Sequence, residues 1–215
     1  MFREIFSIEF WINLLYSIPG MMLGLSIHEF AHAYAAHKMG DDTARNLGRM
    51  TLNPFAHLDL VGTLLLIFAG FGYAKPVPVN PRYYKGNKRV ADNIVSLAGI
   101  TANFFVAITA MFLLHLLIYL GLQNMTIIYM IDYLIIINIA LMVFNLIPVY
   151  PLDGSHVAEN LLIKHIGPEP FMFMRRYRLY ITIALILFIA NTGIISSAVY
   201  AIYNFFDKGF ALLFR

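Results

Sequence analysis

The sequence predicts an all-α polytopic membrane protein with about four transmembrane helices and a short membrane-associated β-hairpin. Of its 215 residues, 60% are hydrophobic and only 13% are charged, whereas soluble proteins carry about 25% charged residues. The mean hydropathy is +0.72. This composition argues against a cytosolic enzyme and against a nucleic-acid-binding protein, and it makes the lipid bilayer the expected surroundings of the chain.

The charged residues leave five long stretches that contain no Asp, Glu, Lys or Arg. These stretches cover residues 10–28, 60–74, 93–131, 133–152 and 179–206. A membrane-spanning helix needs about 20 apolar residues, so the 15 residues of 60–74 are too few and the other four stretches are long enough. We expect the spans at about 10–38, 94–120, 126–147 and 179–205.

Local signals support each expected element. Pro19-Gly20 predicts either a kink in the first span or its true start. Glycines and prolines in and around the short apolar stretch favour a re-entrant or hairpin segment at about 60–79. Backbone of this kind survives at membrane depth only beside protein or a water-filled cavity. After Asp153-Gly154, the spacing of apolar residues predicts a short amphipathic helix.

The basic residues predict the orientation of the chain. The segment 38–91 holds eight Lys or Arg residues and the segment 148–178 holds four, whereas only three lie elsewhere. Loops rich in Lys and Arg remain in the cytoplasm. We therefore expect both segments to be cytoplasmic and both termini to be external.

The pattern His28-Glu29-Phe30-Ala31-His32 carries the strongest chemical signal. Residues at i and i+4 lie on one helix face, so the two imidazoles can share a metal ion, and the Glu between them can act as a general base. Glu29 precedes Lys38 by nine residues, or about 14 Å of helix, which places it inside the bilayer. Ionisable groups are costly there and are usually functional. The alternative is that both histidines bond to neighbouring helices in a packed core.

A third metal ligand has to come from another part of the chain. Because the chain contains no cysteine, only histidine and carboxylate ligands are available. Asp153 is a candidate, since it follows the prolines that break the third span and approaches from the same side of the membrane as the first span. The alternative is that Asp153 caps the helix that begins near Ser155.

Three stretches together resemble the site-2 protease family of zinc intramembrane metalloproteases, in its compact bacterial form. They are HEFAHAYAAHKMGDDTARNLGRMTLNPFAHLDLVGTLL at 28–66, FGYAKPVPVNP at 71–81 and FNLIPVYPLDG at 144–154. The resemblance implies a single membrane-embedded metalloprotease domain over residues 1–215, in a bacterial plasma membrane, with helices around one buried Zn²⁺ ion. One departure is Ile100, which stands where the family usually has a proline.

The resemblance also implies a role for the residues that match the family pattern. His28, His32 and Asp153 would bind the zinc, and Glu29 would be the catalytic general base. Asn145 would help to hold the substrate carbonyl group or the developing oxyanion. The segment 60–79 is likened to a β-hairpin whose edge pairs with an unwound substrate.

Several further residues are expected near the site with less support. His57, Asn53, Gly70 and Gly72 are expected to contact the substrate or to line the entry of water from the cytoplasm. His37 and His156 are weaker candidates for a role at the metal. His115 lies deep in the second span and is expected to pack between helices.

The function implied by the resemblance is that of a zinc-dependent intramembrane endopeptidase, which hydrolyses peptide bonds in or near transmembrane segments of membrane proteins (regulated intramembrane proteolysis). Its partner would be a substrate's transmembrane helix. A membrane peptidase for prenylated or soluble peptides is disfavoured by the short chain and the Leu-Asp-Gly motif. The non-enzymatic alternative is a catalytically silent membrane metal-binding protein or a transporter. Transporters usually have more helices and an internal repeat, and a silent relative would most simply have lost Glu29.

Overall fold

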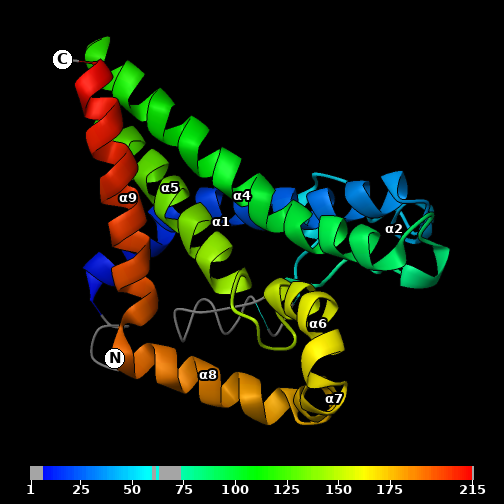
Figure 1. The fold of residues 1–215 in the computed structure, drawn as a ribbon. Coiled ribbons are helices and arrows are strands. Elements are labelled where there is room, and N and C mark those ends of the chain that lie inside the picture. Colours follow the sequence, from blue (N-terminus) through cyan, green and yellow to red (C-terminus); the bar gives the residue numbers. More distant parts are fainter. Residues whose placement is uncertain (1–6, 60–61, 63–73, 215) are drawn as a thin grey trace.

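A computed structural model describes residues 7–59, 62 and 74–214, most of which are helical (Figure 1). Within these residues, three single helices are long and apolar enough to cross a membrane: α1 (Ile8–Lys38), α4 (Lys88–Tyr119) and α5 (Met125–Asn145). They correspond to the first three predicted spans, at 10–38, 94–120 and 126–147. Apolar helices of this length are those of an integral membrane protein.

Helices α1, α4 and α5 pack against one another at the centre of the fold. Asn87 and Asn124 begin α4 and α5, because their side-chain oxygens accept hydrogen bonds from free N–H groups of the first turn. Helix α1 runs through Pro19, so this residue does not mark the start of the helix. Gly20 instead allows a close approach of α5, since a Cβ atom there would lie 2.8 Å from the Cα of Leu134.

Helix α9 (Ile194–Leu213) packs against α5 and α4. The shared core contains Ala107, Ala110, Met111, Leu114, Ile135, Ile139 and Val199. Two polar contacts add to this packing: the Tyr203 hydroxyl donates to Asp132 over 2.6 Å, and His115 Nε2 lies 3.3 Å from a carboxylate oxygen of Asp207. His115 thus lies between helices as expected, in a polar contact with α9.

The predicted fourth span, 179–205, is not one continuous helix. It is divided into α8 (Arg178–Thr192) and α9, which meet at an angle of 63°. Gly193 lies between them with a φ of 63°, a left-handed conformation that ends helices and that glycine adopts without a steric penalty. The chain therefore has three candidate spans among the described residues, or four if the bent pair counts as one.

Short helices occupy the connections. These are α2 (Thr43–Asn46), the 3₁₀ turns η2 (Pro54–Ala56) and η3 (Pro81–Tyr83), α6 (Asp153–Ile166) and α7 (Glu169–Arg176). Helix α6 confirms the amphipathic helix predicted after Asp153-Gly154. Its Asn160 donates hydrogen bonds to Asp92 and Asn93 of α4, so α6 is attached to the helix that also faces His28 and His32.

Tyr150, in the connection before α6, helps to hold α6 and α7 together. Its hydroxyl donates to Glu159 of α6 and accepts from Arg175 of α7, and Arg175 also pairs with Glu159. Burial and the bond to Glu159 raise the pKa of Tyr150 to about 12. The phenol therefore keeps its proton at neutral pH and remains a donor.

Most of the predicted hairpin, 60–79, lies outside the described residues. At its base, Leu58 and Ala74 form an isolated antiparallel bridge, and the N–H of Lys75 donates to the carbonyl oxygen of His57 over 2.8 Å. The part of the chain that is described contains no longer strand. The hairpin therefore stays a prediction, and the described flanks pair in the antiparallel sense that it requires.

Candidate metal centre

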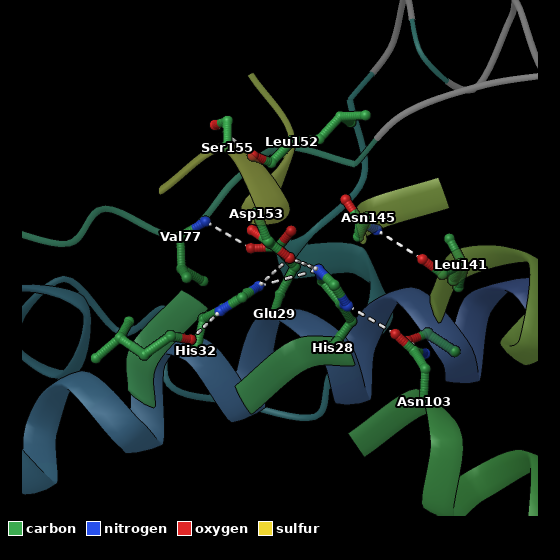
Figure 2. Close-up of polar contacts among 12 residues, drawn as sticks. His28, Glu29, His32, Val77, Asn103, Leu141, Asn145, Leu152, Asp153 and Ser155 are labelled. Atoms are coloured by element: carbon green, nitrogen blue, oxygen red, sulfur yellow. Dashed lines mark hydrogen bonds and ion pairs between the residues drawn. The ribbon is translucent and has the colours of Figure 1, made fainter. Parts of the chain in front are cut away.

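The two histidines of α1 and the aspartate of α6 meet at one point, as Figure 2 shows. His28 Nε2 and His32 Nε2 are 3.0 Å apart, and each lies 3.2 Å from Oδ2 of Asp153. Within the described part of the chain, this is the one group of three or more His, Cys, Asp or Glu residues with ligand atoms close enough for a shared metal ion. Asp153, which follows His32 by 121 positions in the sequence, thus completes one compact triangle with the two histidines.

The hydrogen-bond partners of the two Nδ1 atoms indicate which ring nitrogens carry protons. His32 Nδ1 lies 2.7 Å from the backbone carbonyl oxygen of Val95, and His28 Nδ1 lies 2.6 Å from Oδ1 of Asn103. Both partners are oxygens that only accept, so both Nδ1 atoms donate. In a neutral imidazole the second nitrogen is then an unprotonated acceptor.

A cation fits this arrangement. With both rings neutral, three acceptor atoms face one another, and Asp153 Oδ2 is buried without a hydrogen-bond partner. Such a group is repulsive unless a positive ion lies at its centre. Ligands about 2.0–2.1 Å from a tetrahedral zinc ion are about 3.3 Å from one another, which is close to the observed separations of 3.0 and 3.2 Å. Two His and one Asp leave a fourth position for water.

Gly99 of α4 makes room for the two histidine rings. A Cβ atom at this position would lie 2.5 Å from His32 Nε2 and 2.6 Å from His28 Cε1. Any side chain at 99 would therefore overlap the rings. Helix α4 continues without a break through Ile100, which is buried, so the absence of the family's proline leaves this surface helical.

Asp153 is placed by the close contact between the start of α6 and the end of α5. A Cβ atom on Gly154 would lie 2.4 Å from the carbonyl oxygen of Leu146. Asp153 is the first residue of α6, and Leu152 is the N-cap residue without a side-chain capping bond. The structure therefore does not use Asp153 as the N-cap, which was the alternative explanation for this residue.

Glu29 lies beside the triangle and is 8% exposed. Its Oε2 accepts a hydrogen bond of 2.7 Å from the backbone N–H of Val77. The segment around Val77 is held on both sides: Arg49 donates to the carbonyl oxygen of Lys75 over 2.7 Å, and Asp41 accepts from the N–H of Asn80 over 2.6 Å. The end of the predicted 60–79 segment thus contacts the site directly.

Asn145 is the last residue of α5, near the triangle in Figure 2. Its Nδ2 donates to the carbonyl oxygen of Leu141 over 3.0 Å. The structure therefore brings Asn145 to the edge of the site, with its amide nitrogen bonded to its own helix. Its role towards a substrate stays a prediction.

The other predicted site residues that the structure describes do not join the metal cluster. His57 is 2% exposed and bonds through Nε2 to the carbonyl oxygen of Thr51 over 2.8 Å, while Asn53 caps η2 through a bond from the N–H of Phe55. Gly70 and Gly72 lie outside the described residues. His37 pairs with Asp42 at 2.6 Å, and His156 lies 3.7 Å from Asp92.

Sequence reasoning missed several residues that shape the site. Val95 contributes a carbonyl oxygen, Val77 contributes an N–H group, and Gly99 leaves space for the rings. Residue type alone does not show that these three positions face the site. Asn103 and Asn138 had a visible signal, since polar residues inside apolar spans are usually buried and bonded.

Comparisons with known proteins identify the family. The sequence model of peptidase family M50 matches residues 118–189, which include Asn145 and Asp153. Putative zinc metalloprotease YwhC of Bacillus subtilis is 41% identical over 152 residues, which cover 68% of this chain and 69% of YwhC. This chain belongs to peptidase family M50. The resemblance to the site-2 protease family is thereby confirmed, and zinc is the cofactor of this M50 member.

Two less similar relatives are also named as putative zinc metalloproteases. Putative zinc metalloprotease Rip2 of Mycolicibacterium smegmatis is 30% identical over 166 residues, 71% of this chain and 58% of that protein. The Rip2 protein of Mycobacterium tuberculosis is 28% identical over 189 residues, 81% of this chain and 67% of that protein. No solved structure matches the chain.

Proposed function

We propose that residues 1–215 form one membrane-embedded domain that acts as a zinc-dependent intramembrane endopeptidase and hydrolyses peptide bonds in or near transmembrane segments of other membrane proteins. The observation that carries the proposal is the meeting of three possible ligand atoms, from His28, His32 and Asp153, beside Glu29. Membership of family M50, and relatives named as zinc metalloproteases, support it.

Each residue of the site has a distinct task in this proposal. His28, His32 and Asp153 hold the zinc, whose Lewis acidity, when the ion is bound, activates a water molecule and polarises the scissile carbonyl group. Glu29 accepts the proton of that water and passes it to the leaving amine nitrogen. The N–H of Val77 fixes Oε2 of Glu29, which leaves Oε1 for the proton.

The substrate needs further help, because a helix hides its backbone carbonyl groups. Asn145 is proposed to hold the substrate carbonyl oxygen or the developing oxyanion. The 60–79 segment is proposed to pair with the unwound substrate as an added strand, which replaces the helical hydrogen bonds. His57, Asn53, Gly70 and Gly72 are proposed to flank the path of substrate or water.

The proposed orientation places 38–91 and 148–178 in the cytoplasm and both termini outside. Two ring contacts support the proposed alternation of the spans between the two sides of the membrane. Phe214 packs on Tyr119, and Tyr16 packs on Tyr129. In Figure 1 the end of α9 lies beside the end of α4. The end of α9 therefore lies beside the end of α4 that leads into the short turn to α5, and Tyr16 of α1 contacts the first turns of α5.

Cysteine labelling tests this orientation without background, because the chain has no cysteine. In inside-out vesicles we expect an impermeant maleimide to label Lys85→Cys, and in right-side-out vesicles to label Gln123→Cys and Lys208→Cys. Labelling of Lys208→Cys from the cytoplasmic side would mean that α8 and α9 form a re-entrant pair, and the C-terminus would then be cytoplasmic.

The direct test of function is mass spectrometry of a reaction between the purified protein in detergent and a panel of single-span reporter helices. We expect products cut inside the apolar stretch. They should disappear when a chelator removes zinc and return when zinc is added back. Since the chain alone is used, cleavage would also show that no other domain is required.

The opposite outcome is equally informative. If the reporters stay intact while the protein carries one zinc ion per chain, either the panel lacks the true substrate or the metal serves binding or transport. Each added reporter that is not cut would strengthen the second explanation.

A further inference from the structure

Two asparagines are completely buried in the centre of the helix bundle. Asn103 of α4 and Asn138 of α5 both have an exposed fraction of 0%. A carboxamide at membrane depth has no water to bond with, so its donors and acceptors need protein partners. Both side chains have such partners, and these partners connect α5 to the metal centre through α4.

The hydrogen bonds of Asn103 determine which way its amide group faces. Nδ2 donates one proton to the carbonyl oxygen of Gly24 over 3.1 Å and the other to Oδ1 of Asn138 over 2.8 Å. If the amide were rotated by half a turn, its oxygen would face two acceptor oxygens. Oδ1 of Asn103 is therefore the atom that faces Nδ1 of His28.

Asn138 is oriented in the same way by its own helix. Its Nδ2 donates to the carbonyl oxygen of Leu134 over 2.8 Å, so its Oδ1 is turned to Asn103. Gly24 allows this contact, because a Cβ atom there would lie 3.1 Å from both polar atoms of the Asn138 amide. A backbone carbonyl, which cannot rotate independently, thus determines the direction of the whole chain of bonds.

The two histidines differ in how they are held. His32 Nδ1 donates to a backbone carbonyl, which is always an acceptor, whereas His28 Nδ1 faces an amide that could present either oxygen or nitrogen. We propose that Asn138 is a positioning residue: through Asn103 it keeps His28 protonated on Nδ1, so that the unprotonated Nε2 faces the metal. The inference rests on the proposed role of His28 as a zinc ligand.

The test is the zinc dissociation constant of the purified protein, measured by competition with a chromogenic chelator. Asn138→Leu removes the acceptor that holds the amide of Asn103. We expect zinc to bind about tenfold more weakly, at the lower end of the 10–100-fold losses typical for partners of metal ligands. Asn138→Asp should rescue binding, because a neutral carboxylic acid can donate to Leu134 and accept from Asn103.

A matched control separates positioning from packing. Ile139→Ala alters the next residue of α5, which is 2% exposed and belongs to the apolar core. It should lower thermal stability and leave the zinc dissociation constant unchanged. If Asn138→Leu does not fold, Asn138→Ala takes its place.

The inference is overturned if Asn138→Leu binds zinc as tightly as Ile139→Ala, or if Asn138→Asp is as weak as Asn138→Leu. His28→Ala distinguishes this failure from failure of the proposed function. If His28→Ala loses zinc and Asn138→Leu does not, only the positioning role is wrong. If His28→Ala keeps full affinity, His28 is not a ligand and both proposals fail.

Discussion

Glu29→Gln is expected to abolish cleavage of reporter helices and to leave the zinc content at one ion per chain. Glutamine has nearly the same shape as glutamate, and its amide oxygen can still accept from the N–H of Val77, the partner of Glu29 at 2.7 Å. It cannot accept a proton from water at neutral pH. Loss of a general base typically costs about 10²–10⁴-fold in rate, so product should fall at least about 100-fold.

Mass spectrometry of the reporter products and metal analysis of the same sample check this prediction. The control is Glu169→Gln, which removes an exposed glutamate at the start of α7 and should cut at the normal rate. Cleavage by Glu29→Gln at the rate of the unaltered protein would mean that another group takes the proton. Loss of zinc in Glu29→Gln would mean that Glu29 contributes to metal binding.

Asp153→Ala is expected to lose both zinc and activity. The substitution leaves two imidazoles and no anionic ligand, and two protein ligands are fewer than the three of known catalytic zinc sites. The affinity should fall by more than the about 10–100-fold typical for partners that do not touch the metal. Asp153→Asn keeps the shape but presents a neutral amide oxygen, and we expect an intermediate affinity.

The readout is thermal unfolding with and without added zinc, because a ligand that binds only the folded protein raises its melting temperature. Added zinc should raise the melting temperature of the unaltered protein and not that of Asp153→Ala. Asp207→Asn is a matched control, since Asp207 also faces a histidine, at 3.3 Å from His115, and lies outside the metal cluster. An equal zinc response in Asp153→Ala would exclude Asp153 as a ligand.

The predicted elements that the structure reproduces are those that depend on local sequence. Charge-free stretches of sufficient length became α1, α4 and α5, because insertion in a bilayer requires about 20 apolar residues in a row. The predicted fourth span is divided into α8 and α9, because Gly193 adopts a left-handed conformation that the apolar composition around it conceals.

The sequence alone determined which groups could form the proposed site, because the spacing of His28 and His32 places both rings on one helix face and the absence of cysteine leaves histidine and carboxylate as possible third ligands. Only the tertiary structure decided how those groups are held in place. The acceptors for both Nδ1 atoms, the space beneath the rings at Gly99 and the N–H group beside Glu29 come from residues far away in the chain. These contacts depend on how α1, α4 and α5 pack, which hydrophobic pattern and local spacing do not encode.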